Sequence, residues 1–175
     1  MNYLFLSTLD EKKLEQVVQG HHVGASGKRV DALMKTKGLI SSLCFVEIKT
    51  HRAPLLRDRP YRSECWAASN ELAGAVSQVQ GTVASATATL KDKLELTDSL
   101  GNPTGEAAFN YQPRAFLVIG NLREFVGTQG VNRDRFRSFE LFRRNIVTPE
   151  ILTFDELYER AKFIAHSSEK EKVSA

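Results

Sequence analysis

The sequence predicts a mixed α/β fold in which helices cover a central sheet, and three observations support that prediction. The chain has 175 residues, which is enough for one domain with a sizeable core but too few for two ordinary ones. Hydrophobic residues make up 42% and charged residues 26%, a balance that is typical of globular chains and not of disordered ones. Helical and strand-like patterns alternate along the chain, as they do in folds with helices packed on a sheet.

The first predicted elements are a helix over residues 10–19 and a strand over residues 28–35. Asp10 is a good N-cap for the helix, and Gly20 suits its end. The character of the side chains alternates along the strand, which indicates two different faces. Turn-forming residues at 36–38 then predict a hairpin that leads into a second strand.

The most apolar run of the chain, over residues 39–48, predicts a buried central strand. Two charged residues, Glu47 and Lys49, stand at its end. Because side chains alternate along a strand, both must point to the same side. A carboxylate and an ammonium group at the end of a core strand are costly unless they pair or bind a ligand.

A basic loop is expected over residues 51–63, and a long helix follows it. The loop contains four arginines against one acidic residue, and these arginines are Arg52, Arg57, Arg59 and Arg62. From about Ser69 to Leu90, apolar residues recur at helical spacing and form one stripe. Gln78 lies on the flank of that stripe, about 120° from Leu72 around the helix, from where it could reach the end of the sheet.

The next elements continue the alternation of strands and helices. Turn-forming residues predict a loop or hairpin end over residues 97–113. An apolar run predicts a buried strand over residues 114–120. Phenylalanines at helical spacing predict a helix over residues 132–144, with its phenylalanines inward and its arginines outward.

The C-terminal part is expected to hold an edge strand and a last helix. The strand is predicted over residues 146–152, at an edge because Pro149 has no backbone donor for a sheet. Thr153 and Glu156 have the spacing of a capping box, which begins the helix. Residues 167–175 are charged and are expected to form a flexible tail.

Composition argues against several classes of protein. A net charge of +3 is too small to indicate nucleic-acid binding by itself. The two cysteines, Cys44 and Cys65, do not make a zinc site or a disulfide framework, and Cys44 is expected to be a core thiol. The N-terminal apolar run is too short for a signal peptide, and the uncharged residues 72–90 are too polar for a membrane span. We therefore expect a soluble, cytoplasmic protein with no membrane partner.

Four separated residues could converge on one site, namely Asp31, Glu47, Lys49 and Gln78. If the first two strands pair as a hairpin, a strand spacing of roughly 5 Å brings Asp31 close to Glu47. Two neighbouring carboxylates repel each other unless a cation lies between them, and Mg²⁺ prefers such oxygen ligands. The metal would polarise a phosphate and activate a water, and Lys49 could hold that water.

Each of these residues also has a simpler structural interpretation. Taken alone, Glu47 and Lys49 more often form an ion pair, Asp31 is more often a turn or surface residue, and Gln78 is more often solvated. The sequence shows no Ser-His-Asp or Cys-His motif and no phosphate-binding Gly-rich loop after a strand. On these residues alone, the structural interpretation is favoured.

Longer motifs favour the functional interpretation of these residues over the structural one. They are Gly27-Lys-Arg-Val-Asp31, Cys44-Phe-Val-Glu47-Ile-Lys49, the helical segment 69–78, the apolar segment 116–120 and the segment 151–157. Together they resemble the nuclease domain of the Shedu antiphage defence proteins, a family of the PD-(D/E)XK nuclease superfamily. The resemblance covers most of the chain and implies a nuclease-like central mixed sheet that is flanked by helices.

The resemblance also implies a role for each residue of the site. Asp31 and Glu47 would be metal ligands, with the Ile48 carbonyl as a third, and the metal would be Mg²⁺ or Mn²⁺. Lys49 would orient the nucleophilic water, and Gln78 would be the active-site glutamine. Nucleases of this superfamily often add an acidic residue from the first helix, and here both Glu11 and Glu15 are candidates.

The function that follows is a metal-dependent DNA endonuclease domain in antiphage defence. It would occupy residues 25–166, after a lead-in over residues 1–24, and Arg52, Arg57, Arg59 and Arg62 would bind the DNA. One alternative is a nucleic-acid-binding or assembly module of nuclease fold that needs another region or partner to cut. Another is a structural domain in which Glu47 and Lys49 form a buried ion pair. The apolar surfaces of helices 72–90 and 132–144 also predict a homo-oligomer.

Overall fold

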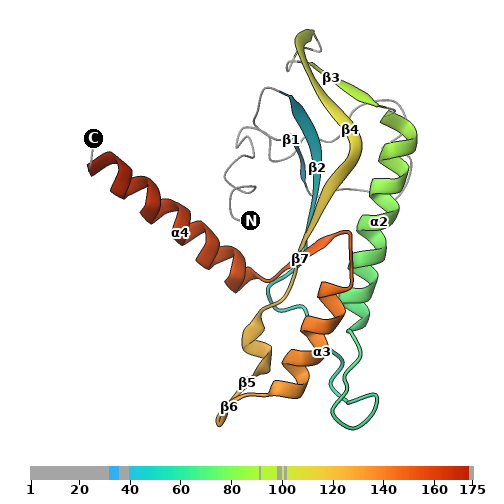
Figure 1. Ribbon diagram of the computed structural model, residues 1–175. Coiled ribbons are helices and arrows are strands. Elements are labelled where there is room, and N and C mark those ends of the chain that lie inside the picture. The colour runs from blue at the N-terminus through green and yellow to red at the C-terminus, as the bar shows by residue number, and fades with distance from the viewer. Residues whose placement is uncertain (1–31, 36–39, 91, 98–99, 101, 174–175) are drawn as a thin grey trace. The chain divides into compact units, whose positions relative to one another are not determined.

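The computed structural model describes residues 32–35, 40–90, 92–97, 100 and 102–173 (Figure 1). The helices in that part are α2 (Asn70–Leu90), the short 3-10 helix η2 (Leu122–Phe125), α3 (Arg133–Arg144) and α4 (Phe154–Val173). The strands are β1 (Ala32–Lys35), β2 (Ser41–Ile48), β3 (Lys93–Thr97), β4 (Pro103–Val118), β5 (Val126–Gly127), β6 (Gly130–Val131) and β7 (Glu150–Leu152). This mixture of helices and sheet confirms the α/β class, while the nuclease superfamily stays a prediction. The expected helix over 10–19, the turn over 36–38 and Asp31 lie outside the described residues.

The chain divides into two compact units, and each of them is discontinuous in sequence. The first unit comprises Met1–Glu47 and Val76–Phe116, and the second comprises Ile48–Ala75 and Leu117–Ala175. We call them the first and the second unit. The division that the sequence suggests, with a nuclease-like domain over residues 25–166, stays a prediction.

The main sheet has five strands. Its order is β1-β2-β4-β3, and β7 also pairs with β4. In the first unit β1 is antiparallel to β2, with Leu33 opposite Phe45 and Met34 opposite Cys44. In the second unit the Ile119 N–H donates to the Leu152 carbonyl over 3.0 Å, at the end of β7.

The core of the first unit lies between the sheet and α2 (Figure 1). Its buried members are Leu33, Leu43, Phe45, Val79, Ala86, Ala108 and Ala115. The predicted stripe on α2 is thereby confirmed, since Val79 is buried and Val83 packs against the same cluster. Ser69 caps this helix, because its hydroxyl accepts the Leu72 N–H over 2.9 Å.

The core of the second unit is aromatic around α3. Phe125 from η2 and Phe139 from α3 are both buried, with their ring centroids 5.5 Å apart. The predicted helix is confirmed, and Asn132 caps it by accepting the Arg135 N–H over 3.1 Å. As expected, phenylalanines face the core.

The capping box at the start of α4 is also confirmed. The Thr153 N–H donates to Glu156 Oε2 over 3.1 Å, and the Thr153 hydroxyl donates to the same oxygen over 3.0 Å. The carboxylate therefore satisfies the backbone donor of the cap residue, as this motif requires. The helical backbone continues to Val173, into the segment that the sequence suggests is a flexible tail.

The predicted loop or hairpin end over residues 97–113 is confirmed only in part. The antiparallel pairing of Thr97 with Pro103 is the end of a hairpin, but the expectation of a loop is wrong from Pro103 onward. A strand, β4, begins at Pro103, and β3 pairs antiparallel with it, with Leu94 opposite Ala108. The glycine, proline and asparagine residues here indicate a turn locally, but the ladder with β3 satisfies the backbone and Leu94 packs against the core. The expected edge strand is shorter than predicted, since β7 begins only after Pro149.

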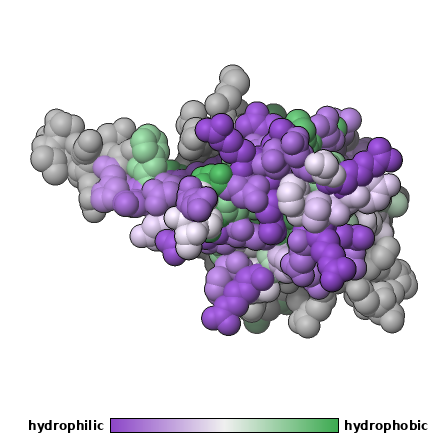
Figure 2. All heavy atoms as spheres, turned by 90° about the horizontal axis from the view of Figure 1, so that it is seen from below, coloured by the Kyte–Doolittle hydropathy of each residue, from purple (hydrophilic) through white to green (hydrophobic). Residues whose placement is uncertain are grey.

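Hydrophilic side chains dominate the face that Figure 2 shows, and the apolar side chains there form small, separate patches. None of the described helices is both long enough and apolar enough to cross a membrane. The uncharged stretch of α2 owes this to its serine, threonine and glutamine residues.

Candidate functional site

Glu47 and Gln78 meet at the end of β2. The Gln78 amide Nε2 donates to Glu47 Oε1 over 2.8 Å, and both residues belong to the first unit. Glu47 continues the face of β2 on which Leu43 and Phe45 are buried, and its own exposure is only 5%. Alternation along the strand thus turns this carboxylate toward the side of the core, where α2 packs.

Burial of the Glu47 carboxylate is costly unless its oxygens are bound. Taking a charged group out of water is unfavourable unless it is paired or hydrogen-bonded, and the Gln78 amide is one of the groups that bind this carboxylate. Gln78 itself is an exposed residue, so the hydrogen-bonded pair lies at the solvent-facing margin of α2. The predicted position of Gln78, on the flank of the buried stripe and within reach of the sheet, is therefore confirmed.

Asp31 lies just outside the described residues. The described register of β1 and β2 ends at Ala32 opposite Val46. Ala32 follows Asp31 in the chain, and Val46 precedes Glu47. The meeting of the two carboxylates stays a prediction.

Lys49 follows Glu47 by two residues but belongs to the second unit. Its backbone N–H donates to the Val118 carbonyl over 2.8 Å, and the residue is half-buried. Ile48 between them is 44% exposed. The predicted role of Lys49 toward Glu47 stays a prediction.

The donor chemistry of the described residues fits a hard cation only in part. Glu47 supplies a buried carboxylate, which is a ligand type that Mg²⁺ and Mn²⁺ accept. Within the described residues, no three His, Cys, Asp or Glu side chains gather closely enough to hold a metal ion. The second predicted carboxylate, that of Asp31, is not among these residues. Cys44 is not a candidate ligand, because burial raises the pKa of its thiol to about 12.

The basic loop between β2 and α2 exposes its arginines. Arg52, Arg57, Arg59 and Arg62 are all exposed, and none of them forms an ion pair with a described carboxylate. Arg57 Nη2 donates to Asn70 Oδ1 over 3.0 Å, and the Arg62 guanidinium lies 5.7 Å from the centroid of the Tyr61 ring. The predicted loop is therefore confirmed, and its positive charge faces solvent.

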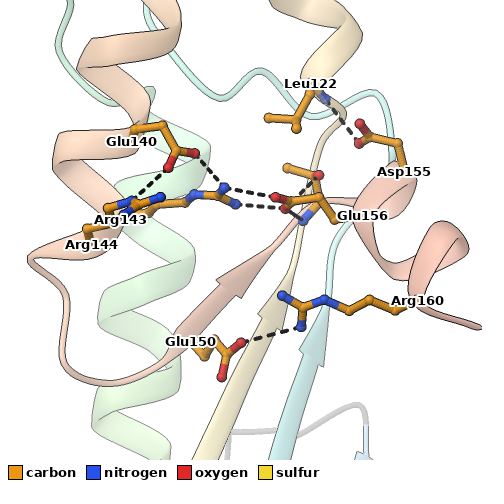
Figure 3. Close-up of polar contacts among 9 residues, drawn as sticks. Leu122, Glu140, Arg143, Arg144, Glu150, Asp155, Glu156 and Arg160 are labelled. Atoms are coloured by element: carbon orange, nitrogen blue, oxygen red, sulfur yellow. Dashed lines mark hydrogen bonds and ion pairs between the residues drawn. The ribbon is translucent and has the colours of Figure 1, made fainter. Parts of the chain in front are cut away.

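The arginines of α3 behave differently, and the expectation that they face solvent is wrong for two of them. Arg143 bonds Glu156 of α4 over 2.7 and 2.8 Å and also pairs with Glu140 (Figure 3). Arg135 pairs with Glu124 of η2 over 2.8 Å. Their side chains are only 16% and 23% exposed. Carboxylates from other elements draw these arginines inward, and helical periodicity cannot reveal such partners.

The pairing of Arg143 with Glu156 shifts the pKa values of both side chains. Burial by itself would raise the pKa of Glu156, but hydrogen bonds from Arg143 and Thr153 outweigh it and lower that pKa. Burial would likewise lower the pKa of Arg143, but Glu156 and Glu140 raise it. Both groups are therefore held in their charged forms at neutral pH.

Comparison with known proteins assigns the family. Residues 1–158 match the family model described as the C-terminal part of the Shedu protein SduA. The chain belongs to the Shedu family. It is also 31% identical over 138 residues to the curated Shedu protein SduA of Bacillus cereus (strain B4264). That match covers 78% of this chain and 34% of the relative, so the chain spans about a third of the length of this Shedu protein.

The motifs that predict the Shedu family also point to Glu47 and Gln78, but they miss the residues that shape the basic loop. Glu124 accepts the Leu55 N–H over 2.6 Å and the Leu56 N–H over 3.2 Å. Gly120, at a φ of +63°, leaves room for Leu55 and Ala53 where a Cβ atom would not fit. For Gly120, the local signal in the sequence is a glycine at the end of an apolar strand. No sequence pattern indicates that Glu124 contacts the basic loop.

Proposed function

We propose that this Shedu chain is the metal-dependent DNA endonuclease portion of an antiphage defence protein. The observation that carries the proposal is a buried carboxylate, Glu47, at the end of a core strand and hydrogen-bonded to Gln78. Charged side chains are seldom buried this fully unless they are paired or bind a ligand. A site that binds a cation would explain why the carboxylate occupies this place.

Each residue of the proposed site has a chemical role. Asp31, Glu47 and the Ile48 carbonyl would hold Mg²⁺ or Mn²⁺. When bound, such an ion polarises a phosphate of the DNA and lowers the pKa of a water molecule. Gln78 would fix the orientation of the Glu47 carboxylate through its 2.8 Å bond. Lys49 joins the proposal on its sequence spacing, as the cation that offsets negative charge in the transition state.

The basic loop supplies the proposed DNA contact. Arginines that are already paired with carboxylates bind phosphates less well, because the pair must first be broken. The four loop arginines have no such partner among the described carboxylates, whereas the exposed Arg137 and Arg144 of α3 pair with Asp134 and Glu140. The loop is therefore a better candidate for phosphate binding than the outer face of α3.

A second candidate function is a nucleic-acid-binding or assembly module that cannot cut by itself. The chain covers only 34% of the length of its curated Shedu relative. Regions that this chain does not contain could therefore complete the activity or control it. This alternative predicts DNA binding by the basic loop without cleavage.

Cleavage of a supercoiled DNA plasmid with added Mg²⁺ tests the proposal. We expect the parent chain to cut, and Glu47→Ala to lose cleavage while it keeps its fold by circular dichroism. Glu106→Ala is the matched control, because it removes an exposed carboxylate from β4. A chain in which Arg52, Arg57, Arg59 and Arg62 are glutamine should bind DNA more weakly and with a flatter salt dependence.

The outcomes separate the two functions. Binding without cutting, with or without Mn²⁺, would favour the binding module. Cleavage by Glu47→Ala at the parent rate would overturn the proposed site.

A further inference from the structure

Glu124 holds the backbone of the basic loop. Its carboxylate accepts the N–H groups of Leu55 and Leu56 over 2.6 and 3.2 Å and pairs with Arg135 of α3 over 2.8 Å. The two loop bonds span 69 and 68 residues of sequence, so this side chain fixes one distant segment to another. Hydrogen bonds to a charged acceptor are stronger than neutral ones, and the Glu124 side chain is only 21% exposed.

Neighbouring contacts hold the same loop at other points. Leu55 and Leu56 are 0% and 1% exposed, so their side chains anchor the segment that lies between Arg52 and Arg57. Further along, the Trp66 N–H donates to the Ser138 hydroxyl over 3.1 Å, and Arg137 donates to the Glu64 carbonyl over 3.1 Å. The loop thus has buried anchors and exposed arginines, which is the arrangement of a preorganised binding surface.

We propose that Glu124 is a positioning residue for nucleic-acid binding: its carboxylate fixes the loop backbone so that Arg52, Arg57, Arg59 and Arg62 meet the phosphate backbone together. This inference rests on the proposed DNA contact of the loop. A preordered loop loses less conformational freedom on binding than a free one, so more of the interaction with phosphates appears as affinity.

Removal of the Glu124 carboxylate is predicted to change DNA affinity in the direction opposite to the one that the change in net charge predicts. Removing a carboxylate near a basic loop makes the surface more positive, which by itself strengthens DNA binding. Loss of the loop anchor weakens binding instead. A weaker complex after removal of a negative charge therefore identifies positioning and not electrostatic repulsion.

The test compares Glu124→Ala with Glu150→Ala in the 175-residue chain. Glu150 is a matched control, because it is a partly buried carboxylate of the same unit that pairs with an arginine, Arg160, over 3.4 Å. The probe is a short DNA duplex, and its affinity is measured by fluorescence anisotropy over a series of salt concentrations. Limited trypsin digestion follows the loop directly, through cleavage after Arg52, Arg57 or Arg62.

We expect Glu124→Ala to bind the duplex more weakly than the parent, with a salt slope that is smaller by about 1 for each phosphate that the loop no longer neutralises. The same variant should be cut faster by trypsin within the loop. Glu150→Ala should bind at least as well as the parent and keep the parent's loop cleavage rate. Glu124→Gln keeps an acceptor oxygen, so its duplex affinity and loop cleavage rate should lie between those of the parent and Glu124→Ala. It replaces the alanine variant in the test if that variant does not fold.

Unchanged or tighter binding by both Glu124 variants, at an unchanged rate of loop cleavage, would overturn the inference. A different set of binding results would contradict the proposed DNA contact of the loop itself. In that case the parent itself would not bind the duplex, or the chain with glutamine at the four loop positions would bind it equally well.

Discussion

The hydrogen bond between Glu47 and Gln78 joins a strand to a helix at the margin of the first unit. The carboxylate lies on the core face of β2, and the amide comes from the exposed flank of α2. Sequence patterns indicate both residues separately, since alternation places Glu47 on the same side of its strand as Lys49 and helical spacing gives the flank on which Gln78 lies. Only the structure shows that the two side chains meet, over a distance of 2.8 Å.

The strength of this bond can be measured with a double-mutant cycle. We expect Glu47→Ala and Gln78→Ala to be coupled by about 1–3 kcal/mol in the free energy of unfolding, because the bond has a charged acceptor. Urea denaturation of the parent, the two single variants and the double variant, without divalent metal, gives this energy. Gln80→Ala in place of Gln78→Ala is the control, and equal coupling in both cycles would contradict a specific bond.

Two glycines should respond to alanine in opposite directions. Gly120→Ala places a Cβ atom 2.6 Å from Leu55 Cδ2 at a φ of +63°, so we expect it to lower the free energy of unfolding by roughly 1–3 kcal/mol or more. Gly81 lies within α2, and apart from its chain neighbours and the backbone of its own helix no atom lies within 4 Å of its Cβ position. Gly81→Ala should raise stability by about 0.4–1 kcal/mol. Thermal or urea unfolding decides both, and a neutral Gly120→Ala would show that the loop has room to shift.

At the scale of elements, ion pairs connect the second unit. Glu156 of α4 pairs with Arg143 of α3, and Glu150 of β7 pairs with Arg160 of α4 (Figure 3). Each of these ion pairs joins two different elements, and the spacing of residues within one helix or strand does not reveal such a pairing. A pattern of alternating charge on one helix predicts a solvated face, and only the packed neighbours show which charges turn inward.

The pair of Glu156 and Arg143 predicts a loss of stability in acid. Because the folded pKa of Glu156 lies below its ordinary value of 4.5, its stabilising effect is complete above that value and is lost as the pH falls through the folded pKa. Glu156→Gln should therefore lower the melting temperature at pH 7 and reduce its fall between about pH 5 and pH 3. Scanning calorimetry measures both, with the exposed Glu159→Gln as the control of equal charge change. An equally steep acid loss in Glu156→Gln would assign the effect to other carboxylates.

At the scale of the whole molecule, the arrangement of apolar side chains bears on self-association. The apolar stripe of α2 is used within the core of the first unit, through Val79 and Val83. Exposed large apolar side chains remain on other elements, among them Leu141 at 58%, Val147 at 97% and Phe163 at 64%. Such side chains are common singly on monomers, and they favour an interface only where they gather.

We still expect a homo-oligomer, because the proposed nuclease, if it cuts both strands, benefits from two sites related by a two-fold axis. Light scattering at micromolar concentration should give a multiple of the chain mass of 19.6 kDa. Phe163→Glu and Leu141→Glu should lower that mass if these side chains lie in the interface. A mass of one chain for the parent would contradict self-association by this segment of the Shedu protein.

The sequence by itself determined the elements whose signals are local. The apolar run of β2, the stripe of α2, the phenylalanine spacing of α3 and the capping box at Thr153 depend on neighbours within one or two turns, and each of these features is predicted from the sequence. The same local logic failed for β4, where turn-forming residues are held in a strand by pairing with β3.

Only the tertiary structure decided which polar groups meet. The bond from Gln78 to Glu47 spans 31 residues, and the bonds from Leu55 and Leu56 to Glu124 span 69 and 68. Such contacts carry no periodic signal, because each depends on how distant elements pack and not on the spacing of residues within one element. The sequence therefore named the residues that we propose bind a metal and phosphates, while the fold decided how the Glu47 carboxylate and the arginine loop are held in place.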